Sequence, residues 1–442
     1  MRILIITLTI ALILSLSCAD NISNKYTREV LPNGLTVIIK YNPDSRIFAV
    51  DILGKNRAAM EEPDKAGITD LVNRMLVKGT KAKNAEEVQA ALDDIGARLK
   101  TNDSPYMPYD DRYTWRAFSF IRFETIDEYA EKGLDILHEI VTEPAFSPTE
   151  LSKTKNRVMG IMGMESGSTY KVCRNLYYSK LFENHPLSNK VLGGRRNLMS
   201  ITSEDLAQYH QKYYAPDNLI LTVVSNINPR NVMDWVKIRF GNMTASDGEN
   251  INLPDAVKAK GIVEIKEPMD KEQIYIYIGN IVPGLKSDSV PALKLTLEIL
   301  STRLKLNLRE KQGLAYSVGA GGRFLENFGW YTCAIGTGYK NFTVAKNGIL
   351  AEIEKLKNEP VEQAELDKAR NSLWGSMLMR NMSCINQAYY MAYYEFVNVG
   401  YDHDDGCRKR LDKINIDDVQ QAAKAYLDAE NYVLAYVGKI NK

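Results

Sequence analysis

The sequence predicts an α+β protein built from two homologous domains, each a mixed sheet with helices packed on it. The first observation is an internal repeat, because residues 205–228 align without gaps with residues 418–441 at an offset of 213. The second is a further matching pair, residues 150–156 and 365–371, at an offset of 215. Two offsets that differ by only two residues indicate one duplication with a small insertion or deletion.

The third observation is a polar connection between the two copies. Residues 244–254 are rich in turn-forming and charged residues, which is typical of an exposed linker between cores. The chain has 442 residues, more than one core usually covers. We therefore expect an N-terminal domain over 26–242, a linker over 243–257 and a C-terminal domain over 258–442.

Strand and helix patterns follow one another within the first copy. Residues 35–41 and 47–54 are β-rich and bounded by turn residues, and residues 219–224 close the unit as a strand. Residues 67–76 form an amphipathic helix, because their apolar side chains recur at i, i+3, i+4, i+7 and i+8. A long helix begins near Pro148, since proline is favoured in the first turn.

The N-terminus predicts export. Arg2 is followed by an apolar run over residues 3–14, which is too short for a membrane span and typical of a signal peptide over residues 1–18. Two cleavage sites compete. The sequence before Cys18 resembles a bacterial lipoprotein site, which implies lipidation of Cys18 and a lipid anchor, and this interpretation is favoured over ordinary cleavage after Ala19. The mature chain is then expected in the bacterial periplasm or envelope.

Charge and cysteine spacing exclude several classes of function. The net charge is only +1, so nucleic acid is not an expected partner. The other four cysteines show no C-x-x-C spacing, which suggests neither zinc nor redox chemistry.

The helix at residues 67–76 carries the most informative motif. Its surroundings, residues 67–80, resemble the start of a pitrilysin/insulinase-type zinc peptidase (an inverted zincin), whose helix carries His-x-x-Glu-His in a similar frame. Here Asp70, Asn73 and Arg74 stand at those three positions. A guanidinium cannot ligate zinc, and an amide cannot act as a general base. The i, i+4 spacing of Asp70 and Arg74 predicts instead an ion pair on the helix surface.

The resemblance covers the chain from about residue 30 to its end, and implies two α+β domains that together form half of a clam-shell chamber. It places the family's third zinc ligand, a glutamate on a later helix, at Gly160. The nearby Glu165 would not restore a site that lacks both histidines. A zinc site built elsewhere remains an alternative, although the four histidines show no ligand spacing: His138, His185, His210 and His403.

The second domain retains the family's other signature. Residues 308–318 read Leu-Arg-Glu-Lys-Gln-Gly-Leu-Ala-Tyr-Ser-Val. In the resembled family this stretch carries an arginine that holds peptide and a tyrosine that stabilises the carbonyl oxyanion. Here these are Arg309 and Tyr316, and their chemistry suits those roles.

Loss of the metal triad beside a retained arginine–tyrosine pair favours a non-catalytic subunit of an exported heterodimeric zinc metallopeptidase. Such a subunit would bind peptide and lend Arg309 and Tyr316 to a zinc-bearing homologous partner. We expect no zinc or other cofactor in this chain, and no cleavage by the chain alone. The alternative is a catalytically dead scaffold or peptide-binding protein of the same family, and a self-sufficient peptidase conflicts with Asp70, Asn73 and Arg74.

Overall fold

The computed structural model describes residues 25–102, 115–246 and 251–440. The predicted signal peptide and Cys18 therefore lie outside the described residues, as does the segment between Asn102 and Trp115. Over the described ranges, no helix has both the length and the apolar character needed to cross a membrane.

The N-terminal domain is a six-stranded mixed sheet in the order β1-β2-β6-β3-β5-β4. Its strands are β1 (Tyr26–Val30), β2 (Thr36–Tyr41), β3 (Ile47–Gly54), β4 (Arg98–Lys100), β5 (Ser119–Ile126) and β6 (Leu219–Ser225). Its helices are α1 (Arg57–Met60), α2 (Ile68–Met75), α3 (Ala85–Asp93), α4 (Ala130–Thr142), α5 (Pro148–Ser166), α6 (Thr169–Leu181), α7 (Arg195–Ser200), α8 (Ser203–Tyr213) and α9 (Pro229–Phe240).

The C-terminal domain is a five-stranded sheet in the order β7-β11-β8-β10-β9. Its strands are β7 (Ile262–Pro268), β8 (Gln273–Pro283), β9 (Ala315–Phe324), β10 (Phe328–Gly338) and β11 (Tyr432–Gly438). Its helices are α10 (Val290–Leu304), continued by a π-helical segment (Lys305–Lys311), then α11 (Phe342–Asn358), α12 (Gln363–Arg380), α13 (Cys384–Phe396), α14 (Cys407–Asp412) and α15 (Ile416–Tyr426).

The two sheets share one topology. In each, one parallel pair (β2 with β6, β7 with β11) is followed by an antiparallel neighbour (β3 or β8) that pairs with the next strand (β5 or β10). The strands β6 and β11 also stand at the repeat offset of 213 residues. The predicted α+β class and the internal duplication are therefore confirmed.

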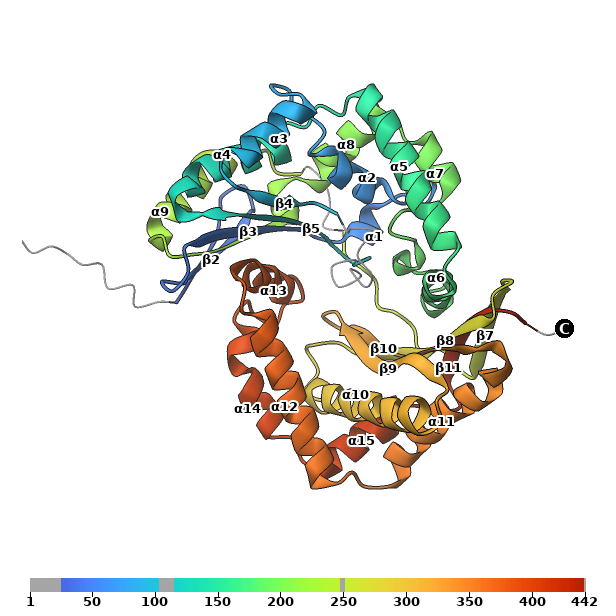
Figure 1. The fold of residues 1–442 in the computed structure, drawn as a ribbon. Helices are drawn as coiled ribbons and strands as arrows, with labels where there is room; N and C mark the ends of the chain where they lie inside the picture. Colours follow the sequence, from blue (N-terminus) through green and yellow to red (C-terminus); the bar gives the residue numbers. More distant parts are fainter. Residues whose placement is uncertain (1–24, 103–114, 247–250, 441–442) are drawn as a thin grey trace, which may run out of the picture.

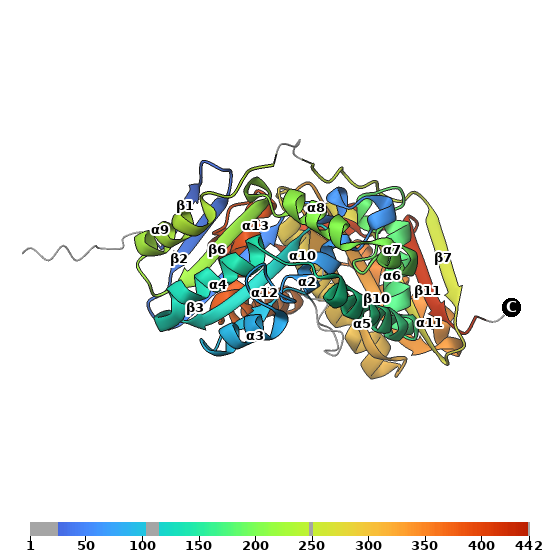
Figure 2. The same cartoon turned by 90° about the horizontal axis from the view of Figure 1, so that it is seen from above.

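The domains exchange helices across their inner sheet faces. Helix α6 of the N-terminal domain packs on β8 and β11, while α13 of the C-terminal domain packs on β3 and β6 (Figure 1). Residues of α13 such as Ala388 and Tyr389 are buried in the same core as Tyr177 of α6. On the outer faces, α2, α4 and α9 pack on the N-terminal sheet and α10 and α11 on the C-terminal sheet (Figure 1). Seen from above, the two domains overlap along most of their length (Figure 2). Because the inner faces are buried by exchanged helices, one hydrophobic core spans both domains, and a second core lies within the N-terminal domain.

Candidate functional site: a degenerate metal helix and an exposed arginine–tyrosine pair

Helix α2 begins at a tight contact with a neighbouring turn. Gly67 has a left-handed φ of 94°, and a Cβ atom there would lie 2.6 Å from the backbone of Leu192 and of Gly193. The Glu61 carboxylate accepts hydrogen bonds from the amides of Gly67 (2.8 Å) and Thr69 (3.3 Å). A carboxylate is favoured at this position, because the N-terminus of a helix carries partial positive charge.

All residues of α2 are buried, including its polar face. The surface ion pair expected from the sequence was wrong in this respect, because α5 and α8 pack against α2. The Arg74 guanidinium donates two hydrogen bonds to Asp70, from Nε to Oδ2 at 2.6 Å and from a terminal nitrogen to Oδ1 at 3.2 Å. The two side chains are only 10% and 7% exposed. A bidentate pair this buried is held far more firmly than a surface pair.

Asn73 is held between two other elements. Its amide nitrogen donates to the carbonyl oxygen of Thr101 at 3.0 Å, and its amide oxygen accepts from the Tyr214 hydroxyl at 2.5 Å. Both ends of the amide are therefore used in packing the domain. Tyr214 was not predicted from the sequence, where its only signal is its place beside Tyr213 at the end of α8.

The residues of α2 do not fit a zinc ion. Both Asp70 oxygens are bound by Arg74, and a permanently charged guanidinium occupies the position where a second ligand would stand. Within the described ranges, no three His, Cys, Asp or Glu side chains are grouped so that they could hold a metal ion.

On α5, the residue that faces the cavity beside α2 is one position later than the predicted ligand position, Gly160. Gly160 is exposed, and a Cβ atom built on it would meet nothing within 4 Å. Ile161 and Glu165 instead line a cavity together with Asp70 and Arg74. The assignment of the third ligand position to Gly160 stays a prediction. The residue that lines the cavity is its neighbour, Ile161.

Arg309 and Tyr316 lie together in the second domain. Arg309 belongs to the π-helical segment and Tyr316 to the edge strand β9. The guanidinium carbon lies 5.6 Å from the centre of the Tyr316 ring, within the range of a cation–π interaction. The Tyr316 residue is 86% exposed and the Arg309 side chain 46% exposed. Neither residue lines the cavity beside Asp70 and Arg74.

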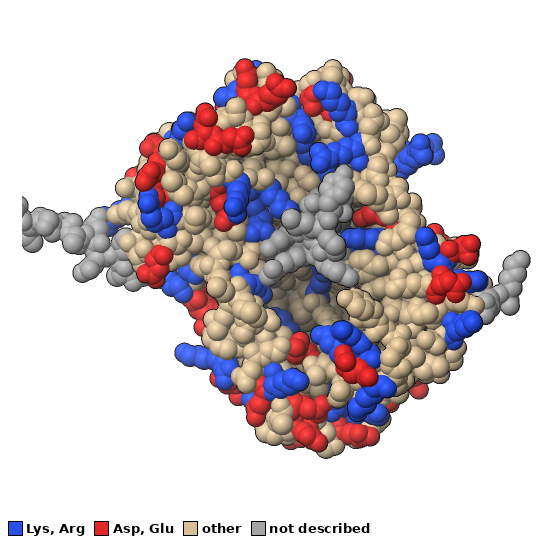
Figure 3. All heavy atoms as spheres, viewed as in Figure 1, with Lys and Arg blue, Asp and Glu red and all other residues tan. Residues whose placement is uncertain are grey.

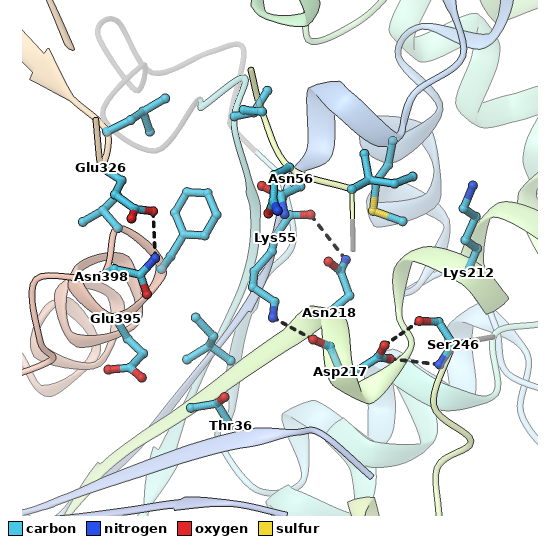
Figure 4. A pocket seen from close by; sticks show the side chains of 18 of the residues that line it. Thr36, Lys55, Asn56, Lys212, Asp217, Asn218, Ser246, Glu326, Glu395 and Asn398 are labelled. Carbon is cyan, nitrogen blue, oxygen red and sulfur yellow. Dashed lines mark hydrogen bonds between the residues drawn. The ribbon is translucent and has the colours of Figure 1, made fainter. Parts of the chain in front are cut away.

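Two large cavities lie between the domains. The first, about 1040 Å³, lies beside the linker and is polar: Lys55 donates to the Asp217 carbonyl, and Asn398 donates to Glu326 (Figure 4). The second, about 470 Å³, adjoins α2. Its lining includes Arg116 from the segment that precedes β5, Arg174 from α6 and Arg323 from β9. None of these three residues was predicted from the sequence, although Arg116 is a lone charge among mostly apolar residues.

The fold and the altered helix together define a two-domain protein of the zinc-peptidase type. Residues 36–195 match the family model described as insulinase (peptidase family M16), and residues 200–373 match the model described as peptidase M16 inactive domain. The chain belongs to the peptidase M16 family.

Relatives agree with this assignment, and solved structures share the fold. The chain is 25% identical over 415 residues to the uncharacterized zinc protease YmxG of Bacillus subtilis, covering 93% of this chain and 97% of that protein. It is 21% identical over 368 residues to the probable mitochondrial-processing peptidase subunit beta of Arabidopsis thaliana, covering 79% and 66%. A crystal structure of a peptidase M16 inactive domain from Pseudomonas fluorescens superposes with a TM-score of 0.85 at 18% identity, covering 95% and 99%. The crystal structure of a protease from Helicobacter pylori superposes with a TM-score of 0.84 at 20% sequence identity, covering 94% of this chain and 99% of that chain.

Proposed function

We propose that this chain is the non-catalytic subunit of an exported heterodimeric zinc metallopeptidase, in which it supplies Arg309 and Tyr316 to a zinc site on a homologous partner. The observation that carries the proposal is the contrast between the two halves of the site. Asp70 and Arg74 are bound to each other in the interior, whereas Tyr316 is 86% exposed beside Arg309. An aromatic residue and an arginine exposed together are typical of a surface that meets a partner.

The chemistry of the pair suits that role. An arginine fork binds the carbonyl or carboxylate oxygens of a peptide, and a phenol can donate a hydrogen bond to the oxygen that becomes negative when a peptide carbonyl is attacked. Zinc would be held by the partner alone, since the α2 side chains do not fit it. The two chains would each form half of a closed chamber around the peptide.

A pull-down of the mature chain from its native envelope, followed by zinc analysis and a peptide-cleavage assay, tests the proposal. We expect a zinc-bearing homologue with an intact His-x-x-Glu-His that cleaves peptide only in the complex. In that complex, Tyr316→Phe should lower kcat by about 100-fold to 1000-fold without weakening assembly, as loss of one oxyanion donor does elsewhere. The matched control Tyr129→Phe, which removes another exposed hydroxyl, should leave kcat unchanged.

The alternative, a scaffold or peptide-binding protein, predicts a different result. Neither Tyr316→Phe nor Arg309→Ala would then change the activity of any complex that contains the chain. Zinc-dependent cleavage by the purified chain alone would overturn both interpretations. Mass spectrometry of the mature N-terminus tests the export proposal separately, since a lipoprotein would begin at a diacylglyceryl-modified Cys18.

A further inference from the structure

Arg309 and Tyr316 are set apart by their backbone rather than by charge. On the face of the C-terminal domain that Figure 3 shows, Lys and Arg side chains are interspersed with Asp and Glu side chains. Arg309 lies in the π-helical segment Lys305–Lys311. Tyr316 lies between two residues of β9 that pair with Gly336 and Thr337, which are adjacent in β10, so Tyr316 is the extra residue of a β-bulge. A π-helical turn and a bulge each add a residue to a regular element, and both are frequent at functional sites.

The π-helical segment is held from its buried side by α11. Leu308 is 1% exposed and packs over Gly348 of that helix, where a Cβ atom would lie 2.5 Å from the leucine side chain. The side-chain amide of Asn307 donates to the Glu352 carboxylate at 2.9 Å. Glu352 is buried, and its carboxylate also accepts from Lys355 at 3.2 Å. A carboxylate is costly to bury unless it is hydrogen-bonded, so these bonds tie the segment to a fixed point in the interior.

A second set of hydrogen bonds ties the bulge to the same segment. The buried Thr337 hydroxyl donates to the Leu314 carbonyl at 2.6 Å. The Leu314 amide in turn donates to the Leu308 carbonyl at 2.9 Å. Beside it, the Gly313 amide donates to the Arg309 carbonyl at 3.0 Å. A shift at either anchor is therefore transmitted to the backbone that carries the arginine–tyrosine pair.

From these contacts we infer that Glu352 and Thr337 are positioning residues for the arginine–tyrosine pair. The 5.6 Å contact between the Arg309 guanidinium and the Tyr316 ring is exposed, and a cation–π contact at an exposed site is too weak to fix two side chains by itself. Its geometry depends on the backbone beneath it, which the two buried anchors hold. The use of the pair in peptide cleavage rests on the proposed function, whereas its positioning is a property of this chain alone.

Fluorine NMR of the purified chain tests the inference without a partner. The chain is labelled with meta-fluorotyrosine, and the Tyr316 resonance is assigned by its loss in Tyr316→Phe. Arg309→Ala then gives the shift of that resonance when the guanidinium is removed. We expect Thr337→Val, which leaves the Leu314 carbonyl without its donor, to move the resonance at least about half as far. Thr337→Ser keeps a hydroxyl and should leave the resonance close to its original position.

Glu352 is tested in the same way with a matched pair of variants. Glu352→Ala removes the acceptor of the Asn307 amide and should displace the Tyr316 resonance. Glu352→Gln keeps an oxygen that can accept the same hydrogen bond and should leave the resonance in place. The control Thr222→Val removes another buried hydroxyl, from β6 of the N-terminal domain, and should not move the resonance either. If Glu352→Ala does not fold, the two Thr337 variants decide, because valine has the shape of threonine.

Three results would contradict the inference. An unmoved resonance in Thr337→Val would overturn it, and an equal displacement in Thr222→Val would do so by indicating a general loosening of the fold. No response to Arg309→Ala would also overturn it, since the pair would then not be in contact in solution. A displacement by Thr337→Val but not by Glu352→Ala would assign the role to Thr337 and overturn it for Glu352.

The complex with a zinc-bearing partner provides a second readout. Because a misplacement of about 1 Å at a catalytic group can cost about 100-fold in rate, Thr337→Val should lower kcat by about tenfold to 100-fold. Thr337→Ser should leave kcat close to that of the unmodified complex. If Tyr316→Phe does not change kcat, the proposed function fails, while the NMR result still decides the positioning, so the two failures are distinguishable.

Discussion

Replacing Arg74 by alanine would show whether the pair that stands in place of the metal motif is a structural element. The substitution leaves the Asp70 carboxylate buried without the two hydrogen bonds that it accepts from Arg74. Breaking a buried ion pair by removing one partner typically costs about 3–5 kcal/mol, because an uncompensated charge stays in the interior. We therefore expect Arg74→Ala to lower the free energy of unfolding by that amount at neutral pH.

The same reasoning predicts an opposite result for a double replacement. In Asp70→Leu/Arg74→Met both charges are removed together, and well-packed apolar residues at a buried pair are often neutral or stabilising by about 1–4 kcal/mol. The double variant should therefore be more stable than Arg74→Ala alone. Such non-additivity is the signature of two residues in direct contact.

Urea unfolding followed by circular dichroism measures these effects, with midpoints compared where the slope of the transition is unchanged. Arg408 provides a matched control, because its i, i+4 ion pair with Asp412 on α14 has side chains that are 41% and 46% exposed. Arg408→Ala should cost less than about 1 kcal/mol. If Arg74→Ala costs no more than Arg408→Ala, or if the double variant loses as much as the single one, the reasoning is refuted.

Three further predictions concern the interior. Burial raises the pKa of the Asp51 carboxyl to about 8. Between the pKa of the unfolded chain and this value, the folded state therefore retains a proton that the unfolded state has lost. Over that range the free energy of unfolding should fall by about 1.4 kcal/mol for each pH unit as pH rises. Asp51→Asn should abolish this slope in urea midpoints measured from about pH 5 to about pH 8, while Asp270→Asn, at an exposed site, should preserve it. Gly67→Ala should lower the melting temperature because its Cβ would collide with the backbone of residues 192–193. Tyr214→Phe should cost about 1–3 kcal/mol in urea unfolding by leaving the Asn73 amide oxygen without its donor.

The fold could be predicted from the sequence because the duplication repeats one pattern of residues twice in the chain. The offset of 213 residues that relates the repeats also relates β6 to β11, and the apolar stripe at 67–76 faces the core as expected. Periodicity reports which face of a helix is apolar, but not what covers the other face. The burial of Asp70 and Arg74 under α5 and α8 therefore could not be predicted from the helical periodicity.

The candidate site was only partly predictable for a similar reason. Arg309 and Tyr316 are seven residues apart and belong to one recognisable segment, whereas Arg116, Arg174 and Arg323 come from three separate parts of the chain that meet only after folding. On α5, a displacement of one residue turns a side chain by about 100° around the helix axis. An alignment that is displaced by one residue therefore exchanges Gly160 for Ile161, the neighbour that lines the cavity.

The exchanged helices hold the two domains together, and this affects whether Arg309 and Tyr316 can act on α2 of their own chain or on a site in another chain. Arg309 and Tyr316 do not line the cavity beside α2, so serving that helix would require the domains to move relative to each other. Such a movement would expose the core that α6 and α13 share, including the fully buried Tyr177 and Ala388. Burial of large apolar side chains contributes about 1.5–3 kcal/mol each, so opening this core is strongly disfavoured. A pair held at the surface of a rigid chain is suited to a site on another chain, and this is the arrangement that the proposed heterodimer requires.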